Sequence, residues 1–316
     1  MLQSLVMNMV LPMLIASGQA EPSPAESQGT ISEEVRELLN ARDEIGTDVL
    51  LDSLDALGRK GDDSALEALG EIYSGTAFFA EPDRSKACSY FAQVKQVRPD
   101  TLHNLATCFH SGDGKAQDFS RARSLYKQAA EIGYPKAKCA YGNMLIAAEG
   151  GVKDIDQGLA LCREAAEVGV ADAQADLAGY LLLGKVVAKD AVEARKWLLA
   201  AANQKHANAS FVLAQVYWNG DGADKDREEA EKWWKAAYQA GRQDASYFLG
   251  RANIAKMFIY TDGRITSVDL KKMQAAQEWF ELAKDNAYRP EQRTEAGKML
   301  VMIEKLSAKY GSQITP

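Results

Sequence analysis

The chain has 316 residues, of which 47% are hydrophobic and 26% charged, and its formal net charge is −7. Such a composition is typical of a globular protein and excludes gross disorder. A net acidic chain whose sequence contains no cluster of Lys and Arg is a poor candidate for binding nucleic acid or an anionic membrane, so we expect neither.

Residues 1–20 have the features of a signal peptide. The apolar segment from Leu5 to Ile15 is too short to span a bilayer, and small residues near Ala20 suit a cleavage site. We therefore expect cleavage near Ala20, export to the periplasm or beyond, and a polar, flexible linker over residues 21–30. The alternative is a buried N-terminal helix, which Pro12 disfavours.

Residues 31–60 are expected to form two amphipathic helices. They lack the landmarks of the repeats that follow, and the exposed face of a terminal repeat must be covered by a cap. Apolar residues at helical spacing predict which side chains face the core. These residues are Val35, Leu38, Leu39, Val49, Leu50, Leu54 and Leu57.

Residues 61–289 repeat with a period of 36 residues, which predicts an array of similar units stacked into a solenoid. Residues 208–241 show the unit most clearly. A first helix is expected from Ala209 to about Trp218, a glycine-rich turn follows it, and a second helix follows Asp226. The period is marked by Leu69, Leu105, Tyr141, Leu177, Leu213 and Leu249.

Short polar residues mark the expected helix starts, because their side chains can accept hydrogen bonds from the backbone N–H groups of the first turn. The expected N-caps of the second helices are Asp118, Asp154, Asp190 and Asp226, and two of them begin capping-box patterns. Those of the first helices are Ser64, Asp100, Asp172, Asn208 and Asp244.

The four cysteines of an exported chain suggest two disulfides. Antiparallel packing of neighbouring helices would bring Cys88 close to Cys108, and Cys139 close to Cys162. The alternative is that these residues are buried free thiols. A metal site at Cys108 with the nearby His103 and His110 is a weaker alternative, and we expect no metal.

The last repeat departs from the register. The turn beginning at Tyr260 resembles the turn beginning at Tyr217, but it lies 43 residues later instead of 36. We therefore expect the first helix of this repeat to be longer by about two turns. Residues 290–316 are expected to form a closing helix and a tail, with Met299, Ile303 and Leu306 facing the core.

The pattern A-x-x-x-L-x-x-x-Y-x-x-G-x-G, then D-x-x-x-A, then W-[WYL]-x-x-A-[AY]-x-x-G, resembles the Sel-one-like repeat (SLR) family, a relative of the tetratricopeptide repeats. The resemblance covers roughly residues 61–286. It implies an all-α fold, a right-handed α-solenoid of antiparallel helix pairs with about six repeats and terminal capping helices.

The resemblance also implies a binding surface, because the first helix of each tetratricopeptide-like repeat lines the concave side of the array. Carried over by register, the exposed positions on two successive first helices would bind a partner. The alternative is that the aromatic residues among them pack against the helix that follows Phe248. The candidate binding residues are Phe211, Gln215, Trp218, Tyr247, Arg251 and Ile254.

The sequence contains no catalytic or phosphate-binding motif, so we expect neither an enzyme nor a cofactor. The first hypothesis is an exported, monomeric scaffold that holds a partner protein, such as an envelope component or a sensor, in its groove. The second is an immunity protein that blocks a secreted antibacterial toxin. A weaker alternative is an accessory protein of polysaccharide binding or export.

Overall fold

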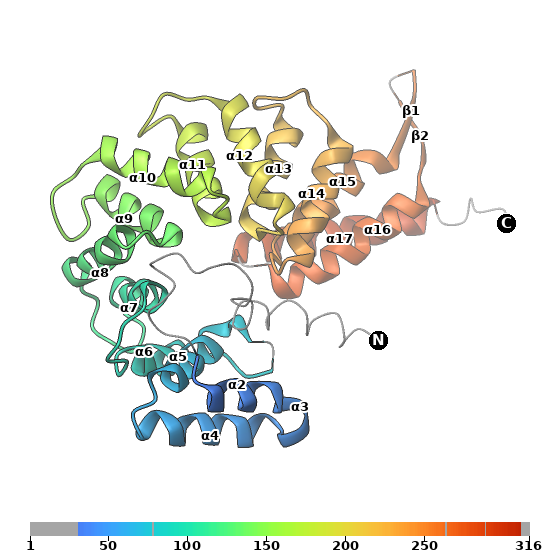
Figure 1. Ribbon diagram of the computed structural model, residues 1–316. Helices are drawn as coiled ribbons and strands as arrows, with labels where there is room; N and C mark the ends of the chain where they lie inside the picture. The colour runs from blue at the N-terminus through green and yellow to red at the C-terminus, as the bar shows by residue number, and fades with distance from the viewer. Residues whose placement is uncertain (1–30, 78, 263, 288, 311–316) are drawn as a thin grey trace. The chain divides into compact units, whose positions relative to one another are not determined.

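The computed structural model describes residues 31–77, 79–262, 264–287 and 289–310 (Figure 1). The expected signal peptide over 1–20 and linker over 21–30 lie outside the described residues, as does most of the expected tail. The chain divides into two compact parts, Met1–Glu164 and Ala165–Pro316, which we call the N-terminal and C-terminal parts and describe separately.

The N-terminal part is built of helices joined by short turns. Its helices are α2 (Glu33–Asn40), α3 (Arg42–Ile45), α4 (Thr47–Arg59), α5 (Asp63–Glu71), the π-helical turn η1 (Ile72–Thr76), α6 (Arg84–Phe91), α7 (Pro99–Ser111), α8 (Phe119–Glu131), α9 (Pro135–Ala147) and α10 (Ile155–Glu167), within which this part ends.

The C-terminal part continues the helical pairs and adds one β-hairpin. Its elements are α11 (Ala171–Leu183), α12 (Ala191–Asn203), α13 (Ala207–Asn219), α14 (Arg227–Gln239), α15 (Ala245–Met257), β1 (Phe258–Thr261), β2 (Arg264–Val268), α16 (Leu270–Asn286) and α17 (Pro290–Tyr310). Consecutive helices pack in pairs in both parts, so the expected all-α solenoid architecture is confirmed.

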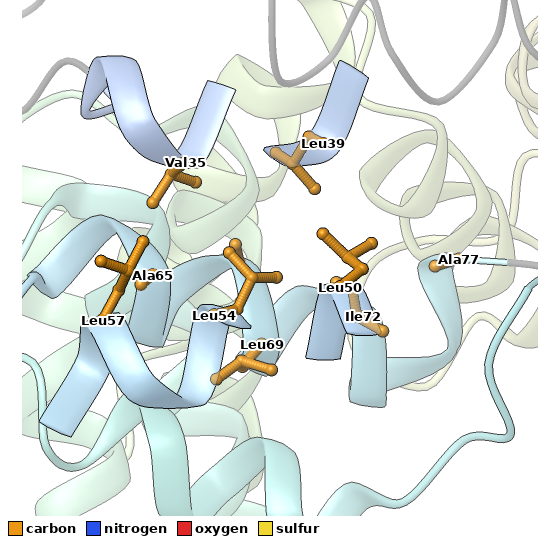
Figure 2. Close-up of a cluster of buried hydrophobic side chains, with 10 residues drawn as sticks. Val35, Leu39, Leu50, Leu54, Leu57, Ala65, Leu69, Ile72 and Ala77 are labelled. Carbon is orange, nitrogen blue, oxygen red and sulfur yellow. The ribbon is translucent and has the colours of Figure 1, made fainter. Parts of the chain in front are cut away.

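The helices before the first repeat cover its apolar face. In Figure 2, side chains of α2 and α4 point toward one another, with Leu69 and Ile72 from the following segment in the same cluster. Val49 is an exception to the expectation, because it is 52% exposed and faces away from this core. The residues of the cluster that were expected from the sequence and are buried are Val35, Leu39, Leu50, Leu54 and Leu57.

The expected lengthening of the first helix in the last repeat is wrong. Helix α15 has 13 residues, as α13 does, and the additional residues form the antiparallel hairpin of β1 and β2 (Figure 1). The segment from Phe258 to Val268 is rich in β-branched and aromatic residues, which favour strands over helix. Asp262 has a φ of +51°, and the Asp262-Gly263 pair is a typical hairpin turn sequence.

The N-caps of the second helices are as expected. The carboxylate of Asp118 accepts a hydrogen bond from the backbone N–H of Arg121, and Asp154, Asp190 and Asp226 do the same in their helices. The reciprocal half of the capping box is absent, because the backbone N–H of Asp190 donates to the carbonyl of Leu181.

Most of the expected N-caps of the first helices are wrong. Helices α7, α11 and α13 begin two residues earlier than expected, so Asp100, Asp172 and Asn208 lie in the first turn. Ahead of α11 and α13 the reason is a compact turn: a single residue with positive φ, Gly169 or Lys205, reverses the chain, and the next helix starts almost at once. For α5 the cap is Asp62 in place of the expected Ser64.

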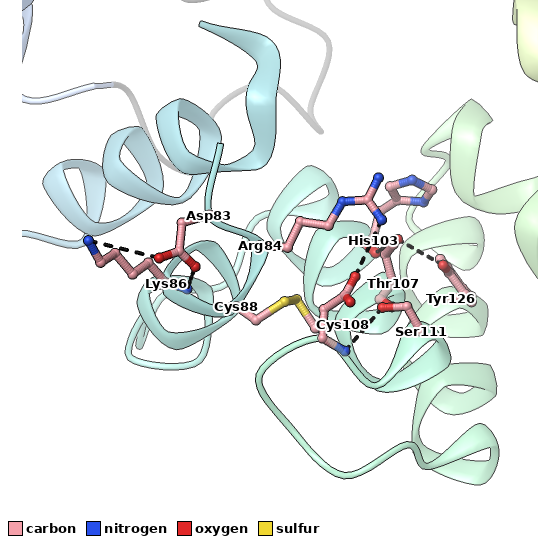
Figure 3. Close-up of a disulfide and its surroundings, with 10 residues drawn as sticks. Asp83, Arg84, Lys86, Cys88, His103, Thr107, Cys108, Ser111 and Tyr126 are labelled. Atoms are coloured by element: carbon pink, nitrogen blue, oxygen red, sulfur yellow. Dashed lines mark hydrogen bonds and ion pairs between the residues drawn. A yellow bond between two sulfur atoms is a disulfide. The ribbon is translucent and has the colours of Figure 1, made fainter. Parts of the chain in front are cut away.

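Both expected disulfides are present. Cys88 of α6 is bonded to Cys108 of α7 with a Cα–Cα distance of 5.7 Å (Figure 3), and Cys139 of α9 to Cys162 of α10 with a distance of 4.0 Å. The alternative of buried free thiols is therefore wrong. Because Cys108 is bonded to Cys88, its sulfur is not available as a metal ligand beside His103.

Two glutamates at the start of the repeats lie in surroundings that raise their pKa. Glu67 is buried, accepts a hydrogen bond from the hydroxyl of Thr101 and pairs with Arg98 at 2.8 Å. Glu71 accepts a hydrogen bond of 2.6 Å from the amide of Asn104. Burial raises the pKa of each carboxyl above its ordinary value, and these contacts only partly offset it.

We predict that Glu71→Gln stabilises the protein at pH 7. The raised pKa of Glu71 means that the folded protein favours the neutral carboxylic acid. The stability that this neutral form contributes is fully present below the ordinary glutamate pKa, and it is lost as the pH rises through the raised value and the buried group becomes charged. Glutamine keeps an acceptor for Asn104 and removes the charge. Denaturant unfolding from pH 4 to 7 should show a stability gain that shrinks toward pH 4; a gain independent of pH would contradict this account.

Candidate functional site

A pocket of about 340 Å³ lies between α11 and α13 in the C-terminal part. It exists because α11 carries Ala175 and Gly179 at positions where α13 carries Phe211 and Gln215. A Cβ atom placed on Gly179 would meet nothing within 4 Å, so this side of the pocket is open. Leu198 of α12 and Val212 of α13 contribute apolar walls.

The rim of this pocket is polar and acidic. It includes the exposed Asp172 and Asp176 of α11, together with His206 and Asn208 at the start of α13. The His206 side chain is 18% exposed and its Nε2 lies 3.0 Å from Oδ1 of Asp172. Two carboxylates at the rim suit a cationic or hydrogen-bond-donating group of a ligand.

His206 has a structural role that the sequence analysis missed. It is the N-cap of α13, and its Nδ1 accepts a hydrogen bond of 3.0 Å from the backbone N–H of Ala209. Both contacts are satisfied when the proton is on Nε2, which can then donate to Asp172. The sequence analysis placed the helix start at Asn208 and so overlooked His206, two residues earlier.

Phe211 is not exposed as expected. It is 6% exposed, lies edge-on to Phe248 at a centroid distance of 5.1 Å, and is covered by the guanidinium of Arg242 at 4.4 Å. The alternative left open was packing against the helix that follows Phe248, whereas Phe211 packs against Phe248 itself and under Arg242. Arg242 is held in place by Asp244, which accepts its hydrogen bonds, and by Asn208. Phe211 therefore supports the surface from beneath.

Trp218 and Tyr247 belong to the same aromatic cluster but remain partly exposed. The ring of Trp218 is 5.3 Å from that of Trp234, which in turn is 5.4 Å from Phe248. Tyr247 lies 5.3 Å from Phe248. The cluster thus fixes two large, partly accessible rings on α13 and α15 through the buried Trp234 and the partly buried Phe248.

The other three candidate residues differ in accessibility. Arg251 is exposed and its guanidinium lies 5.8 Å from the ring centre of Tyr247. Gln215 is partly exposed. Ile254 packs against the apolar cluster that includes residues of α16 and α17, so it belongs to the core more than to the surface.

None of the six candidate residues lines the pocket, although α13, which carries three of them, forms one of its walls. The candidates are large side chains at exposed positions, whereas the pocket is created by small ones. The available signal was Ala175 and Gly179 at positions where the next two repeats carry Phe211 with Gln215 and Tyr247 with Arg251.

Among the described residues there is neither a membrane-spanning helix nor a metal-binding cluster. None of the helices in this part of the chain combines the length and the apolarity needed to cross a bilayer. No group of three or more His, Cys, Asp or Glu side chains within the described ranges is arranged to hold a metal ion.

Solved structures with a similar fold include a Sel1 repeat protein from Oxalobacter formigenes, with a TM-score of 0.59 and 21% identity over 82% of this chain and 100% of that one. A protective antigen of uropathogenic Escherichia coli with an SLR fold has a TM-score of 0.52 and 20% identity, over 79% of this chain and 52% of that one. An immunity protein from Pseudomonas aeruginosa has a TM-score of 0.47 and 16% identity, over 68% of this chain and 84% of that one.

Comparison with curated proteins finds no match. Comparison with protein families finds five successive Sel1 repeats, which together span more than half of the chain. They cover residues 99–134, 135–170, 171–206, 207–241 and 243–288. The repeat expected at 61–98 lies outside the matched residues. The chain belongs to the Sel1 repeat family.

Proposed function

We propose that this protein is a non-catalytic scaffold that binds a partner protein on the surface formed by α11, α13 and α15. Sel1 repeat proteins generally act as protein-interaction scaffolds. The observation that carries the assignment to this surface is the series Trp218, Tyr247 and Arg251, which are partly or fully accessible on successive first helices. Large aromatic residues and arginine supply most of the binding energy in protein interfaces.

The pocket beside these residues indicates the chemistry of the partner. Asp172 and Asp176 provide negative charge at its rim, and the small Ala175 and Gly179 leave room for an inserted side chain. A lysine or arginine of the partner would form ion pairs with these carboxylates while its aliphatic stem packs against Val212. The partner is therefore expected to present a cationic side chain next to an apolar contact with Trp218.

We also propose that the protein works outside the reducing cytosol. Its four cysteines form two disulfides, which persist in oxidising compartments. An immunity protein against a secreted toxin, or an accessory protein of polysaccharide export, would be exported as well. Identification of the partner distinguishes these roles from that of an envelope scaffold.

The test begins with a photo-crosslinking amino acid placed at Gln215, with the exposed Lys196 of α12 as the control position. A partner that is crosslinked in the producing cells from position 215 but not from 196 is then identified by mass spectrometry. Recovery of a toxin would favour the immunity role. Equal crosslinking from both positions would contradict the proposed surface.

The second step measures the affinity of the identified partner for Trp218→Ala. We expect a loss of at least about tenfold, because a partly exposed tryptophan at the centre of an interface is a typical hot spot. Trp197→Ala is the matched control, since Trp197 is also partly exposed but lies on α12, a second helix. Both variants are first checked for unchanged unfolding behaviour, and equal affinities for the two would show that Trp218 does not bind the partner.

A further inference from the structure

A second surface of the C-terminal part carries positive charge, although the chain as a whole is acidic. A groove of about 580 Å³ is lined by residues of α14 together with one residue each of α15 and α16. Four lysines and two glutamates contribute to it. The lysines are Lys232, Lys235, Lys256 and Lys272. None of the candidate binding residues or pocket residues named above belongs to this groove, which we call the lysine groove.

A nearly buried carboxylate holds two of these lysines in place. The side chain of Glu231 is only 11% exposed, and its Oε1 and Oε2 lie 3.0 Å from Nζ of Lys235 and 2.9 Å from Nζ of Lys256. Burial alone would raise the pKa of Glu231, but the hydrogen bonds from Lys256 and Lys235 outweigh it and lower the pKa. Glu231 is therefore charged at neutral pH and fixes both ammonium groups at the groove.

The positive charge in the groove exceeds what its own carboxylates neutralise. Lys235 and Lys256 share the single carboxylate of Glu231, and Lys272 has no ion pair among the described residues. Lys232 pairs with Glu229 one turn away, an exposed contact that contributes little energy and is easily exchanged. The four lysines thus outnumber the carboxylates of Glu228, Glu229 and Glu231, which leaves a net positive charge for an anionic ligand.

We propose that the lysine groove binds an acidic segment of a polypeptide. Lysine binds carboxylates as a point charge and needs no fixed bidentate geometry, so lysines spread along a groove suit carboxylates spread along a chain. The groove also contains Glu228, which can accept hydrogen bonds from the amide N–H groups of a peptide.

The hairpin of β1 and β2 extends the surface with apolar contacts. Lys256 lies two residues before the hairpin and Lys272 four residues after it. Two lysines of the groove therefore flank the hairpin in the sequence. It projects from the junction of α15 and α16 (Figure 1) and exposes Ile259, Tyr260 and Ile265 by 47%, 60% and 45%. The segment that binds is therefore expected to combine acidic residues with apolar ones.

The experiment uses the full chain with its disulfides formed and two fluorescent 14-residue peptides, one alternating Glu with Leu and one alternating Gln with Leu. Fluorescence anisotropy should show binding of the Glu peptide that weakens with added salt, and binding of the Gln peptide at least about tenfold weaker. Vesicles of phosphatidylcholine with phosphatidylglycerol, and inorganic phosphate, are the other arms. Binding to either of these in preference to the Glu peptide would overturn the proposal.

The matched variants are Lys272→Glu and Lys271→Glu, which change the net charge equally. They occupy neighbouring positions in the first turn of α16, where a glutamate favours the helix, so both are expected to fold. Lys272 lines the groove and Lys271 does not. Lys272→Glu should weaken binding of the Glu peptide at least about tenfold, and Lys271→Glu by less than about threefold. Equal effects of the two variants would contradict a localised groove.

Discussion

Replacement of both Cys88 and Cys108 by alanine is expected to lower the free energy of unfolding by about 3 kcal/mol. The disulfide closes a loop with a sequence separation of 20, and a loop of this size restricts the unfolded chain by about that amount. Both sulfurs are buried beside Ala87 and Phe91, so alanine leaves no unsatisfied polar group there. Urea unfolding followed by circular dichroism measures the difference.

The second disulfide provides the control for this prediction. Cys139 and Cys162 are separated by 23 residues, so replacing them by alanine should cost a similar amount. If the loss comes from restriction of the unfolded chain, a reducing agent should abolish most of the difference between wild type and either variant. A variant without Cys88 and Cys108 that unfolds at the same urea concentration as oxidised wild type would contradict the prediction.

Replacement of Gly158 by alanine is expected to destabilise the protein by about 2 kcal/mol, although alanine is the better helix former. Gly158 of α10 faces Gly142 of α9. A Cβ atom on Gly158 would lie 2.6 Å from the carbonyl oxygen of Gly142, and one on Gly142 would lie 2.5 Å from that of Gly158. The nearest atom met is in each case a backbone oxygen, and the Cys139–Cys162 disulfide links the same two helices. A rotamer change of Ile146, whose Cγ1 would lie 2.7 Å from the new Cβ atom on Gly158, therefore does not relieve the clash.

Gly297→Ala is the matched control. Gly297 lies inside α17, and a Cβ atom there would meet nothing within 4 Å. This substitution should therefore raise the free energy of unfolding by up to about 1 kcal/mol through helix propensity and the restricted unfolded chain. Thermal and urea unfolding of the two variants should move in opposite directions. Stabilisation by both would show that α9 and α10 can separate without cost.

The pair of glycines also shows how the repeats differ under a constant period. In three of the other repeats the positions equivalent to Gly142 and Gly158 are pairs of buried alanines where first and second helices cross: Ala106 with Ala122, Ala178 with Ala194, and Ala214 with Ala230. The crossing of α9 and α10 leaves no room for those two methyl groups. The period predicts that two helices cross at this position, whereas the side chains decide how closely they approach.

The repeat period was sufficient to predict most of the architecture. Each repeat must bury the same helical faces against its neighbours, and Leu177, Leu213 and Leu249, which mark the period, are all buried. The same reasoning placed Cys88 opposite Cys108 and Cys139 opposite Cys162. The same reasoning did not predict the residues at which the first helices begin. The period fixes the spacing between helix starts, but the geometry of the preceding turn sets their absolute position.

The interruption of the period shows a different limit. Ten additional residues in the last repeat could lengthen a helix or form another element, and the helical register offered no means of choosing. The strand propensity of Phe258–Val268 and the Asp-Gly pair at residues 262 and 263 were the local evidence for a hairpin. The resemblance between the segments that begin at Tyr260 and Tyr217 had favoured a longer helix instead.

The sequence by itself determined the all-α solenoid, the cysteine pairs and the family, because each depends on spacing along the chain. Only the tertiary structure decided which side chains are accessible. Phe211 is covered by Arg242 and Phe248 from the next repeat, and the lysine groove unites Lys232, Lys235, Lys256 and Lys272 from three helices. A sequence without a visible basic cluster therefore folds into a protein with a local one, since packing, and not adjacency in the chain, sets which charges meet.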